Sequence, residues 1–287
     1  MLNAGDYGLA VQERAELIML SDIAGYVGAD TCGCLLAIRQ DQQEEISLMI
    51  DIGTNGEMVL GNRERMVTCS TAAGPAFEGA KIECGMRGAA GAVDHVKYED
   101  GKWNYTTVGN KPAVGLCGSG LIDLVAGLLD AGMLDENGVL RSGQEKQSVF
   151  ILVPPERGGN ERGVYLTQKD LGEVQLAKAA IAAGIQMLME RLGITEDDIC
   201  SVYIAGAFGN YMDPVSAGKI GLLPATLVKK VKPVGNAAGE GAKIALVNEK
   251  EMLEMDELVR KIEFVELAAS ADFQDHFIDE LGFETGE

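Results

Sequence analysis

Glycine gathers in short clusters along this 287-residue chain, and their positions constrain the fold more than any other feature of the sequence. The 37 glycines make up about 13% of the residues, which is nearly twice the average usage of about 7%. Four clusters lie where strands or helices are predicted to begin or end: DIGTNGE (51–57), GLCGSG (115–120), IAGAFGN (204–210) and VGNAAGEGA (234–242). Because α/β domains bind ligands at such ends, and glycine lets a ligand approach the backbone closely, the clusters together predict an α/β domain with a nucleotide cleft.

The first half of the chain is predicted to form strands and loops after a helical segment. Apolar residues at helical spacing predict one or two helices over 16–38. Asn55-Gly56 is expected to form a two-residue hairpin turn with positive φ angles. Small-residue breaks predict loops over 71–93, and a peripheral hairpin over 93–114 is expected to turn at Asp100-Gly101. The strands expected here cover 46–53, 57–62 and 65–70.

The second half alternates predicted helices and strands. Ser119 is expected to cap the helix that follows GLCGSG. Thr167 and Asp170 are expected to begin the longest helix, which ends at Gly193. The remaining expected elements are a strand over 200–206, a strand around Val231, a helix over 253–261, a strand over 262–267 and a helix over 272–281. This order predicts a mixed sheet flanked by helices.

The charge balance excludes several classes of partner. With 24 Lys plus Arg against 44 Asp plus Glu, the formal net charge is −20, so the chain lacks the basic surface that nucleic acids and acidic membranes require. No apolar run approaches the roughly 20 residues needed to span a bilayer. Acidic residues at positions 6, 13 and 16 are unlike a secretory signal, and a cytoplasmic location is expected.

The cysteines are scattered and do not form a metal-binding motif. They contain no C-x-x-C pair, so neither a zinc site nor an iron–sulfur cluster is predicted. Cys32 and Cys34 are two residues apart on an expected helix, where their side chains diverge. Free buried thiols are therefore expected for the six cysteines, at positions 32, 34, 69, 84, 117 and 200.

The DIGTNGE cluster can bind phosphate and a metal ion. Asp51 ends a predicted buried strand and is a candidate Mg²⁺ ligand, because Mg²⁺ keeps several waters and takes few carboxylates. The turn that follows, Gly53, Thr54, Asn55 and Gly56, offers backbone amides and side-chain donors for an anion. An ordinary hairpin with Asx-turn hydrogen bonds is equally compatible with this spacing.

The other glycine clusters are weaker signals when taken singly. Gly206, Ala207 and Gly209 follow a predicted strand and would let a base or ribose lie against the backbone, although a tight strand-to-helix connection alone explains them better. Gly118 and Ser119 would present helix N-terminal amides to an anion, and close packing of that helix on a strand is equally compatible.

Few side chains in the sequence are candidates for chemistry. Glu57 and Glu78 are candidates for orienting a catalytic water, against the simpler interpretation that they are solvated or structural. His95 and His276 are the only histidines and are 181 residues apart, which favours structural roles over a Ser-His-Asp or Cys-His arrangement.

Six ordered motifs together resemble a known family. The chain resembles the C-terminal part of the ATP-dependent reductive activators of corrinoid proteins, whose nucleotide-binding portion belongs to the superfamily of acetate and sugar kinases, Hsp70 and actin. This implies a ribonuclease-H-like lobe in which DIGTNGE is a phosphate loop and IAGAFGN is the adenosine motif. Asp51 and Glu57, which lie in DIGTNGE, are the catalytic candidates. The motifs are DIGTNGE, STAAGPAFEGA, GLCGSGLID, LTQKDLGEVQLAKAAI, IAGAFGNYMDP and VELAASADFQDHF.

The chain differs from the complete members of that family in two features. They carry an upstream lobe with its own D-x-G-T phosphate loop and an iron–sulfur domain, and neither motif is found here. The resemblance therefore implies a truncated chain, a split gene product or a natural fragment, with residues 1–45 as a helical remnant of a first lobe. Residues 46–287 would be the second ATP-binding lobe, with a peripheral insertion near 93–166.

The resemblance implies a function in anaerobic corrinoid methyl-transfer systems. Complete activators couple ATP hydrolysis to reduction of a Co(II) corrinoid to Co(I). ATP and Mg²⁺ are the expected cofactors, a corrinoid protein is the expected partner, and an upstream lobe or iron–sulfur subunit is a further one. Weak or no ATP hydrolysis is expected of this chain alone. Two alternatives stay open: an activator of the 2-hydroxyacyl-CoA dehydratase type, and a non-enzymatic docking module for a corrinoid protein.

Overall fold

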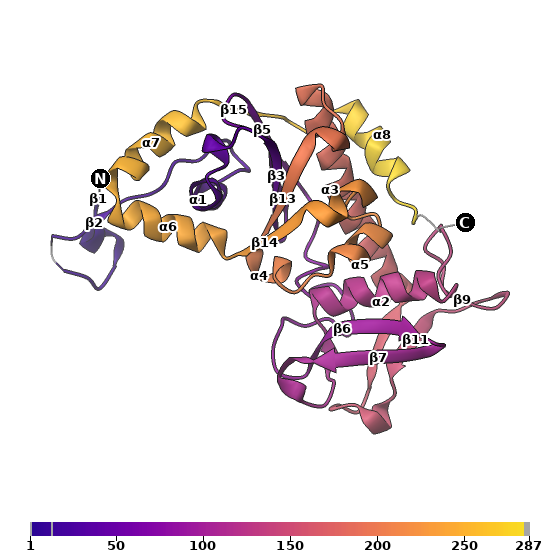
Figure 1. Ribbon diagram of the computed structural model, residues 1–287. Helices are drawn as coiled ribbons and strands as arrows, with labels where there is room; N and C mark the ends of the chain where they lie inside the picture. Colours follow the sequence, from indigo (N-terminus) through magenta and orange to yellow (C-terminus); the bar gives the residue numbers. More distant parts are fainter. Residues whose placement is uncertain (1, 13, 284–287) are drawn as a thin grey trace.

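A mixed six-stranded sheet forms the centre of the molecule (Figure 1). The computed structural model describes residues 2–12 and 14–283, with Ala207 and Phe208 described by their backbone alone; residues 1, 13 and 284–287 of the predicted domains lie outside the described part. The strand order is β14-β13-β3-β4-β5-β15. The strands are β3 (Ile46–Ile52), β4 (Gly56–Gly61), β5 (Met66–Thr71), β13 (Ile199–Ala205), β14 (Val231–Gly235) and β15 (Ile262–Phe264).

The sheet combines two kinds of pairing. β3, β4 and β5 form an antiparallel meander, whereas β13 pairs parallel to β3, β14 parallel to β13, and β15 parallel to β5. The parallel partners all come from the second half of the chain, because a parallel strand must be reached by a long crossover, here one that includes a helix. The predicted mixed sheet flanked by helices is confirmed.

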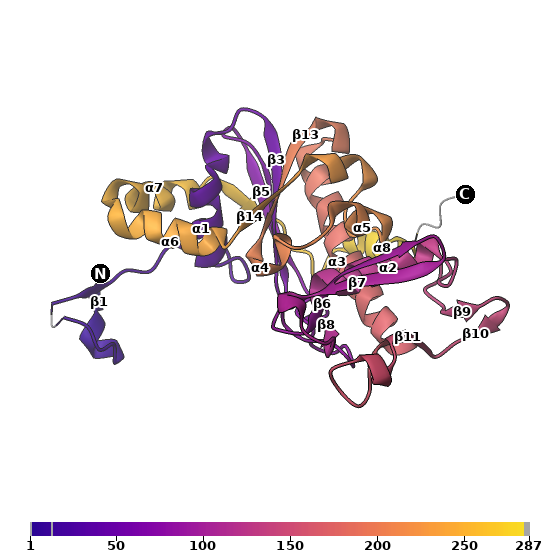
Figure 2. The ribbon, with the colours of Figure 1, turned by 60° about the horizontal axis from the view of Figure 1, so that its bottom comes forward.

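Helices cover both faces of the sheet (Figures 1 and 2). On one face, α1 (Ala29–Ile38), α6 (Ala237–Val247) and α7 (Glu249–Val259) share a hydrophobic core with Met49 of β3. On the other face, α3 (Gln168–Leu192) contacts β4 and β5, with α8 (Ala271–Asp279) packed on α3. Leu48 and Ile50 of β3 belong to this second core. Alternate residues of β3 are thus buried on opposite faces, as the strand period requires.

A smaller unit lies beside the sheet and is built around the predicted hairpin. β6 (Ala92–Glu99) and β7 (Lys102–Thr107) pair antiparallel, and the turn between them has φ of 52° at Asp100 and 74° at Gly101, so that turn is confirmed. α2 (Gly118–Asp130) packs on β6. The other strands of this region are β8 (Gly115–Leu116), β9 (Arg141–Ser142), β10 (Glu145–Lys146), β11 (Val149–Val153) and β12 (Val164–Thr167).

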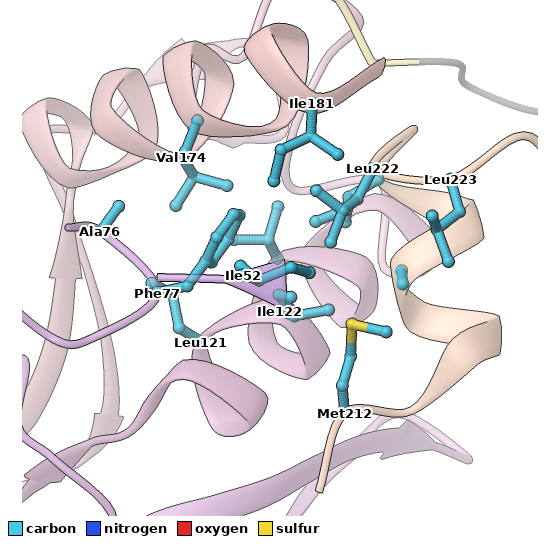
Figure 3. Packing of buried hydrophobic residues seen from close by; sticks show 14 of the residues in the cluster. Ile52, Ala76, Phe77, Leu121, Ile122, Val174, Ile181, Met212, Leu222 and Leu223 are labelled. Carbon is cyan, nitrogen blue, oxygen red and sulfur yellow. The ribbon is translucent and has the colours of Figure 1, made fainter. Parts of the chain in front are cut away.

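Phe77 joins the two regions (Figure 3). It follows β5 within the loops of residues 72–91, is 3% exposed, and belongs to the same core as Ile52 at the end of β3. Leu121 of α2 and Val174 of α3 are members of this core. The end of β3, where the first glycine cluster begins, is therefore anchored by packing against two helices.

The longest helix agrees with its predicted ends. Thr167 and Asp170 form a capping box at the start of α3, and Gly193 ends it with φ of 70°. At α2 the cap prediction is wrong: Cys117 is the N-cap residue, and Ser119 lies inside the first turn, where its hydroxyl donates to the Asp94 carbonyl over 2.8 Å. Thr195 forms a second capping box, with Asp198, at a short 3₁₀ turn.

The helix expected over 16–38 begins only at Ala29. Residues 16–17 form β2 (Glu16–Leu17), which pairs with β1 (Leu2–Asn3), and turns follow up to the N-cap Gly28. Leu20 and Ile23 of this segment pack against the core under α1, whereas Met19 is 74% and Tyr26 71% exposed. Figure 2 shows this arm extending away from the sheet. The assignment of residues 1–45 to a first lobe stays a prediction. α1, which lies in this range, packs on one face of the central sheet.

The tail follows the expected order with shifted ends. α7 begins four residues earlier than predicted, β15 ends at Phe264 instead of 267, and α8 covers Ala271–Asp279. In the described part of the chain, no helix combines the length and apolar character that crossing a bilayer requires.

Close packing of α1 on α6 generates a test of the fold. A Cβ at Gly241 of α6 would overlap the carbonyl oxygen of Gly33 in α1, so Gly241→Ala is expected to lower the free energy of unfolding by about 1–3 kcal/mol through overpacking. Gly172, in the interior of α3, has nothing within 4 Å of an added Cβ. Gly172→Ala should therefore stabilise the protein by about 0.5–1 kcal/mol. Urea denaturation measures the free energy of unfolding of both variants. The same change in both would contradict the claim that Gly241 is needed for the close approach of α1 and α6.

Candidate nucleotide site

Two of the glycine clusters leave the sheet side by side. β13 runs parallel to β3 with Ala205 paired to Asp51, so the segments after both strands emerge at the same end of the sheet. Gly206 has φ of 88°, and a Cβ added there would lie 3.1 Å from Asp51 Oδ1. Gly206 therefore meets two demands, a left-handed backbone conformation and close approach to a carboxylate, which together exclude a side chain.

The predicted two-residue turn at Asn55-Gly56 is wrong. Ile52 pairs with Gly56, so the loop has three residues, Gly53 to Asn55, and the Gly53 amide donates to the Asn55 carbonyl over 2.9 Å. Neither Asn55 nor Gly56 has a positive φ. Gly56 is instead a strand residue whose added Cβ would lie 2.9 Å from Thr71 Oγ1, so its position is explained by packing.

Gly53 and Gly209 differ in what surrounds them. The nearest atom to an added Cβ at Gly53 is Glu78 Oε1, at 3.7 Å, so the loop backbone there is open to approach. At Gly209 an added Cβ would lie 2.6 Å from Ile204 Cγ2, so the missing side chain makes room for β13 itself. Both residues stay predicted ligand contacts. The side chain of Ala207, a third predicted contact, lies outside the described part.

A row of polar side chains crosses three strands at this end of the sheet. Asp51 pairs with Glu57, and Glu57 pairs with Ser70, so the three side chains share one face. Ser70 Oγ donates to Glu57 Oε1 over 3.1 Å. Met49 and Val59, two residues away on β3 and β4, belong to the core under α1, which shows that the row points toward α1.

Both carboxyl groups of the row ionise less readily than usual. Burial raises the pKa of Asp51 and of Glu57, and the negative charge of Asp30 at the start of α1 adds to both effects. Burial, followed by the Asp51 charge, also raises the pKa of the Cys34 thiol. Carboxylates that are desolvated and close to one another gain most from a cation, since a cation offsets the cost of burying their charge.

The residues at this end of the sheet fit Mg²⁺ bound through water. Mg²⁺ takes one or two carboxylates and completes its shell with waters and phosphate oxygens. Asp51 provides a half-buried carboxylate beside an open glycine loop, which matches that need. Among the residues that the structure describes, no group of three His, Cys, Asp or Glu side chains is arranged to hold a metal ion by itself.

A pocket of about 380 Å³ adjoins the Gly53–Asn55 loop. Thr54 Oγ1 donates to Glu78 Oε2 over 3.2 Å, and Glu78 lines the pocket. The predicted contacts Gly118 and Ser119 line it too, but the Ser119 hydroxyl is occupied by Asp94, so this turn offers its backbone. Tyr211, which directly follows the IAGAFGN cluster (204–210), also lines the pocket. The volume falls in the range of small-molecule sites.

Of the further residues near the site, Asp30 and Cys34 have no signal in the motifs, whereas Gly235 and Asn236 lie in a glycine cluster. Asp30 and Cys34 of α1 approach Asp51 only through the packing of that helix on the sheet. Gly235, at the end of β14, has φ of 61° and lies beside the Asn210 side chain, and Asn236 caps α6 by accepting from the Gly239 amide. The glycine cluster at 234–242 marked these last residues, whereas no spacing in the sequence linked 30 or 34 to 51.

The histidines and most cysteines lie outside this site. His95 Nδ1 is 3.1 Å from Asp123 Oδ2, and His276 Nε2 is 2.9 Å from Glu190 Oε1, so each meets a carboxylate of another element. All six cysteines are free; those at 32, 34, 69 and 117 are buried, Cys84 is half-buried and Cys200 is exposed. The expectation of buried thiols is thus confirmed for four and wrong for Cys200.

The fold and the strand-end loops define an ASKHA domain, a class of nucleotide-binding domain, and comparison with known proteins identifies the family. Residues 45–287 match the family model described as the C-terminal, ASKHA domain of RACo. The chain belongs to this family. The ribonuclease-H-like, mixed-sheet lobe expected from the sequence is thereby confirmed.

Characterised relatives carry corrinoid-related names. The chain is 36% identical to "Corrinoid activation enzyme RamQ" of Eubacterium limosum, covering 96% of this chain and 49% of that protein. It is 29% identical to "[Co(II) methylated amine-specific corrinoid protein] reductase" of Methanosarcina barkeri, covering 97% of this chain and 54% of that protein. The chain spans about half the length of the curated relatives it matches.

A solved structure of a reductive activator also matches the chain. "Reductive activator for corrinoid,iron-sulfur protein" superposes with a TM-score of 0.90 at 38% identity, over 98% of this chain and 46% of that one. The TM-score and the identity together show that this chain shares its fold with a reductive activator.

The raised pKa of Asp51 gives a prediction for stability without nucleotide. A carboxyl group whose pKa is higher in the folded state binds its proton more tightly there than in the unfolded state. The free energy of unfolding therefore falls as the pH rises from about 3.9, the ordinary Asp value, through the raised pKa of Asp51. Asp51→Asn removes this loss. We expect the variant to be more stable than the wild type at pH 7, by an amount that narrows as the pH approaches 4.

Urea denaturation between pH 4 and pH 8 measures the difference. Asp197→Asn is the matched control, because Asp197 is exposed at the opposite end of β13. A constant difference between Asp51→Asn and the wild type across this pH range would show that burial of the charge is not its source.

Proposed function

We propose that this chain is the ATP-binding lobe of a reductive activator of a corrinoid protein. The observation that carries the proposal is the convergence of Asp51, the open Gly53–Asn55 loop and Gly206 at one end of the sheet, in a domain of the ASKHA family. Asp51 would hold Mg²⁺, directly or through water, and the loop amides with the Thr54 hydroxyl would bind phosphate oxygens.

The remaining parts of the site support binding of a whole nucleotide. The backbone at Gly206, Ala207 and Gly209 would lie near the adenosine, and the pocket between Glu78 and Tyr211 adjoins the phosphate loop through the Thr54 hydrogen bond. Glu57, held by Ser70 in the same row as Asp51, would orient the attacking water. Bound Mg²⁺ would neutralise phosphate charge beside the carboxylates of Asp51 and Glu57, and Arg87 lines the adjoining pocket.

In the complete activator, ATP hydrolysis would be coupled to a one-electron reduction. The electron, supplied by an iron–sulfur donor, would convert an inactive Co(II) corrinoid to Co(I), and hydrolysis would supply the free energy for this uphill transfer. Relatives that cover this chain almost completely are named for corrinoid activation and for reduction of a Co(II) corrinoid protein, which favours this function over activation of a 2-hydroxyacyl-CoA dehydratase.

Calorimetric titration tests the phosphate-loop assignment. We expect the wild type to bind Mg-ATP and Asp51→Asn to bind it at least about tenfold more weakly, because loss of one charge-assisted metal contact costs on the order of 1.4 kcal/mol or more. In EDTA the two proteins should bind ATP with similar, low affinity. Asp197→Asn, which removes an exposed carboxylate far from the site, should bind Mg-ATP as the wild type does.

The titration also distinguishes the docking-module alternative. Equal binding of Mg-ATP by the wild type and Asp51→Asn would remove the phosphate-loop assignment. A chain that binds no Mg-ATP and still retains a Co(II) corrinoid protein on an affinity column would be a docking module.

A further inference from the structure

We propose that Cys34 is a positioning residue for Asp51: its thiol hydrogen-bonds one carboxylate oxygen so that the other faces the cleft. The inference rests on the proposed function in taking Asp51 as the Mg²⁺-binding group. It adds a residue that lies 17 positions upstream, on a helix that none of the glycine motifs includes.

The contact joins a helix in the layer above the sheet to the end of a central strand. Cys34 Sγ lies 3.7 Å from Asp51 Oδ2, within reach of a hydrogen bond that involves sulfur. Cys34 is completely buried, in the core that α1 shares with the sheet. The backbone amide of Ala238, in the first turn of α6, faces the same sulfur. The thiol therefore lies where α1, α6 and the end of β3 meet.

Glycine contacts between the helices fix the position of this sulfur. A Cβ at Gly33 would lie 2.8 Å from the Ala238 carbonyl oxygen, and one at Gly241 would overlap the Gly33 carbonyl. α1 and α6 thus touch backbone to backbone beside Cys34. Because neither helix can shift without opening this contact, the sulfur is held at a defined distance from Asp51.

The chemistry of a thiol suits this position. Asp51 Oδ1 is the oxygen near Gly206, at 3.1 Å from the added Cβ, whereas Oδ2 faces Cys34. A neutral donor on Oδ2 restrains rotation of the carboxylate and leaves its negative charge available for a cation. A lysine or arginine would neutralise that charge, and an apolar side chain would leave Oδ2 without this donor.

The matched control lies two residues away. Cys32 is on the same helix and, like Cys34, is completely buried. Cys32→Ala therefore removes a buried thiol of the same size without touching Asp51. Cys34→Ser keeps a hydroxyl donor, and Cys34→Ala removes the donor. A purely structural role would make the two alanine variants behave alike.

The first measurement is the Mg²⁺ concentration that gives half-maximal ATP binding at fixed ATP. We expect Cys34→Ala to need about tenfold more Mg²⁺ than the wild type, Cys34→Ser to recover most of the loss, and Cys32→Ala to be unchanged. ATP binding in EDTA should be the same in all four proteins. An equal shift in Cys32→Ala and Cys34→Ala, or no shift in Cys34→Ala, would overturn the proposal.

The second measurement needs no nucleotide, so it separates this proposal from the proposed function. Unfolding in urea of Cys34→Ala, Asp51→Asn and the double variant gives the coupling between the two side chains. We expect a departure from additivity of at least about threefold in the unfolding equilibrium constant, and additive effects for Cys32→Ala with Asp51→Asn. Additive effects of Cys34→Ala and Asp51→Asn would overturn the proposed hydrogen bond even if the protein binds Mg-ATP. Coupling between them in a protein that binds no Mg-ATP would overturn the proposed function and leave the hydrogen bond supported.

Discussion

The parallel pairing of β13 with β3 is the constraint on which the candidate site depends. These strands are separated by more than 140 residues of sequence, and their register places Ala205 beside Asp51. A shift of one residue would turn Asp51 to the opposite face, because strand side chains alternate. The register is fixed by burial on both sides, with Ile50 in the core under α3 and Met49 in the core under α1. The buried core thus determines where the two glycine loops meet.

Contact between α1 and α6 sets the electrostatics at the same place. The backbone approach at Gly33 and Gly241 brings Asp30 and Cys34 to the face that already carries Asp51 and Glu57. Burial and like charge then raise the pKa values of both carboxyl groups, which is unfavourable for the protein alone and favourable for a bound cation. Destabilised charges of this kind are typical of functional sites, where stability is lost in return for ligand affinity.

The sequence was sufficient for features that depend on local chemistry. The α3 capping box, the left-handed turn at Asp100-Gly101 and the strands on either side of DIGTNGE follow from residues a few positions apart. Features that depend on distant partners were predicted less well. Gly56 and Gly209 stay predicted ligand contacts, but no feature of the sequence indicated that Thr71 and Ile204 occupy the space next to their missing side chains. Ser119 was predicted as a cap, but its hydroxyl donates to the Asp94 carbonyl, and no local feature of the sequence marks the contact of Cys34 with Asp51.

A bound divalent cation would make the strongly negative charge of the chain compatible with a phosphate-binding role. A nucleotide needs a positive field, and here backbone amides of the Gly53–Asn55 loop are the protein groups next to the paired carboxylates. Amides at a glycine loop carry partial positive charge without a side chain, but they cannot offset a triphosphate beside Asp51 and Glu57. A divalent cation resolves this, because it binds the carboxylate and the phosphate together and removes the repulsion between them. On this argument nucleotide binding should depend steeply on the metal, even though Arg87 lines the adjoining pocket.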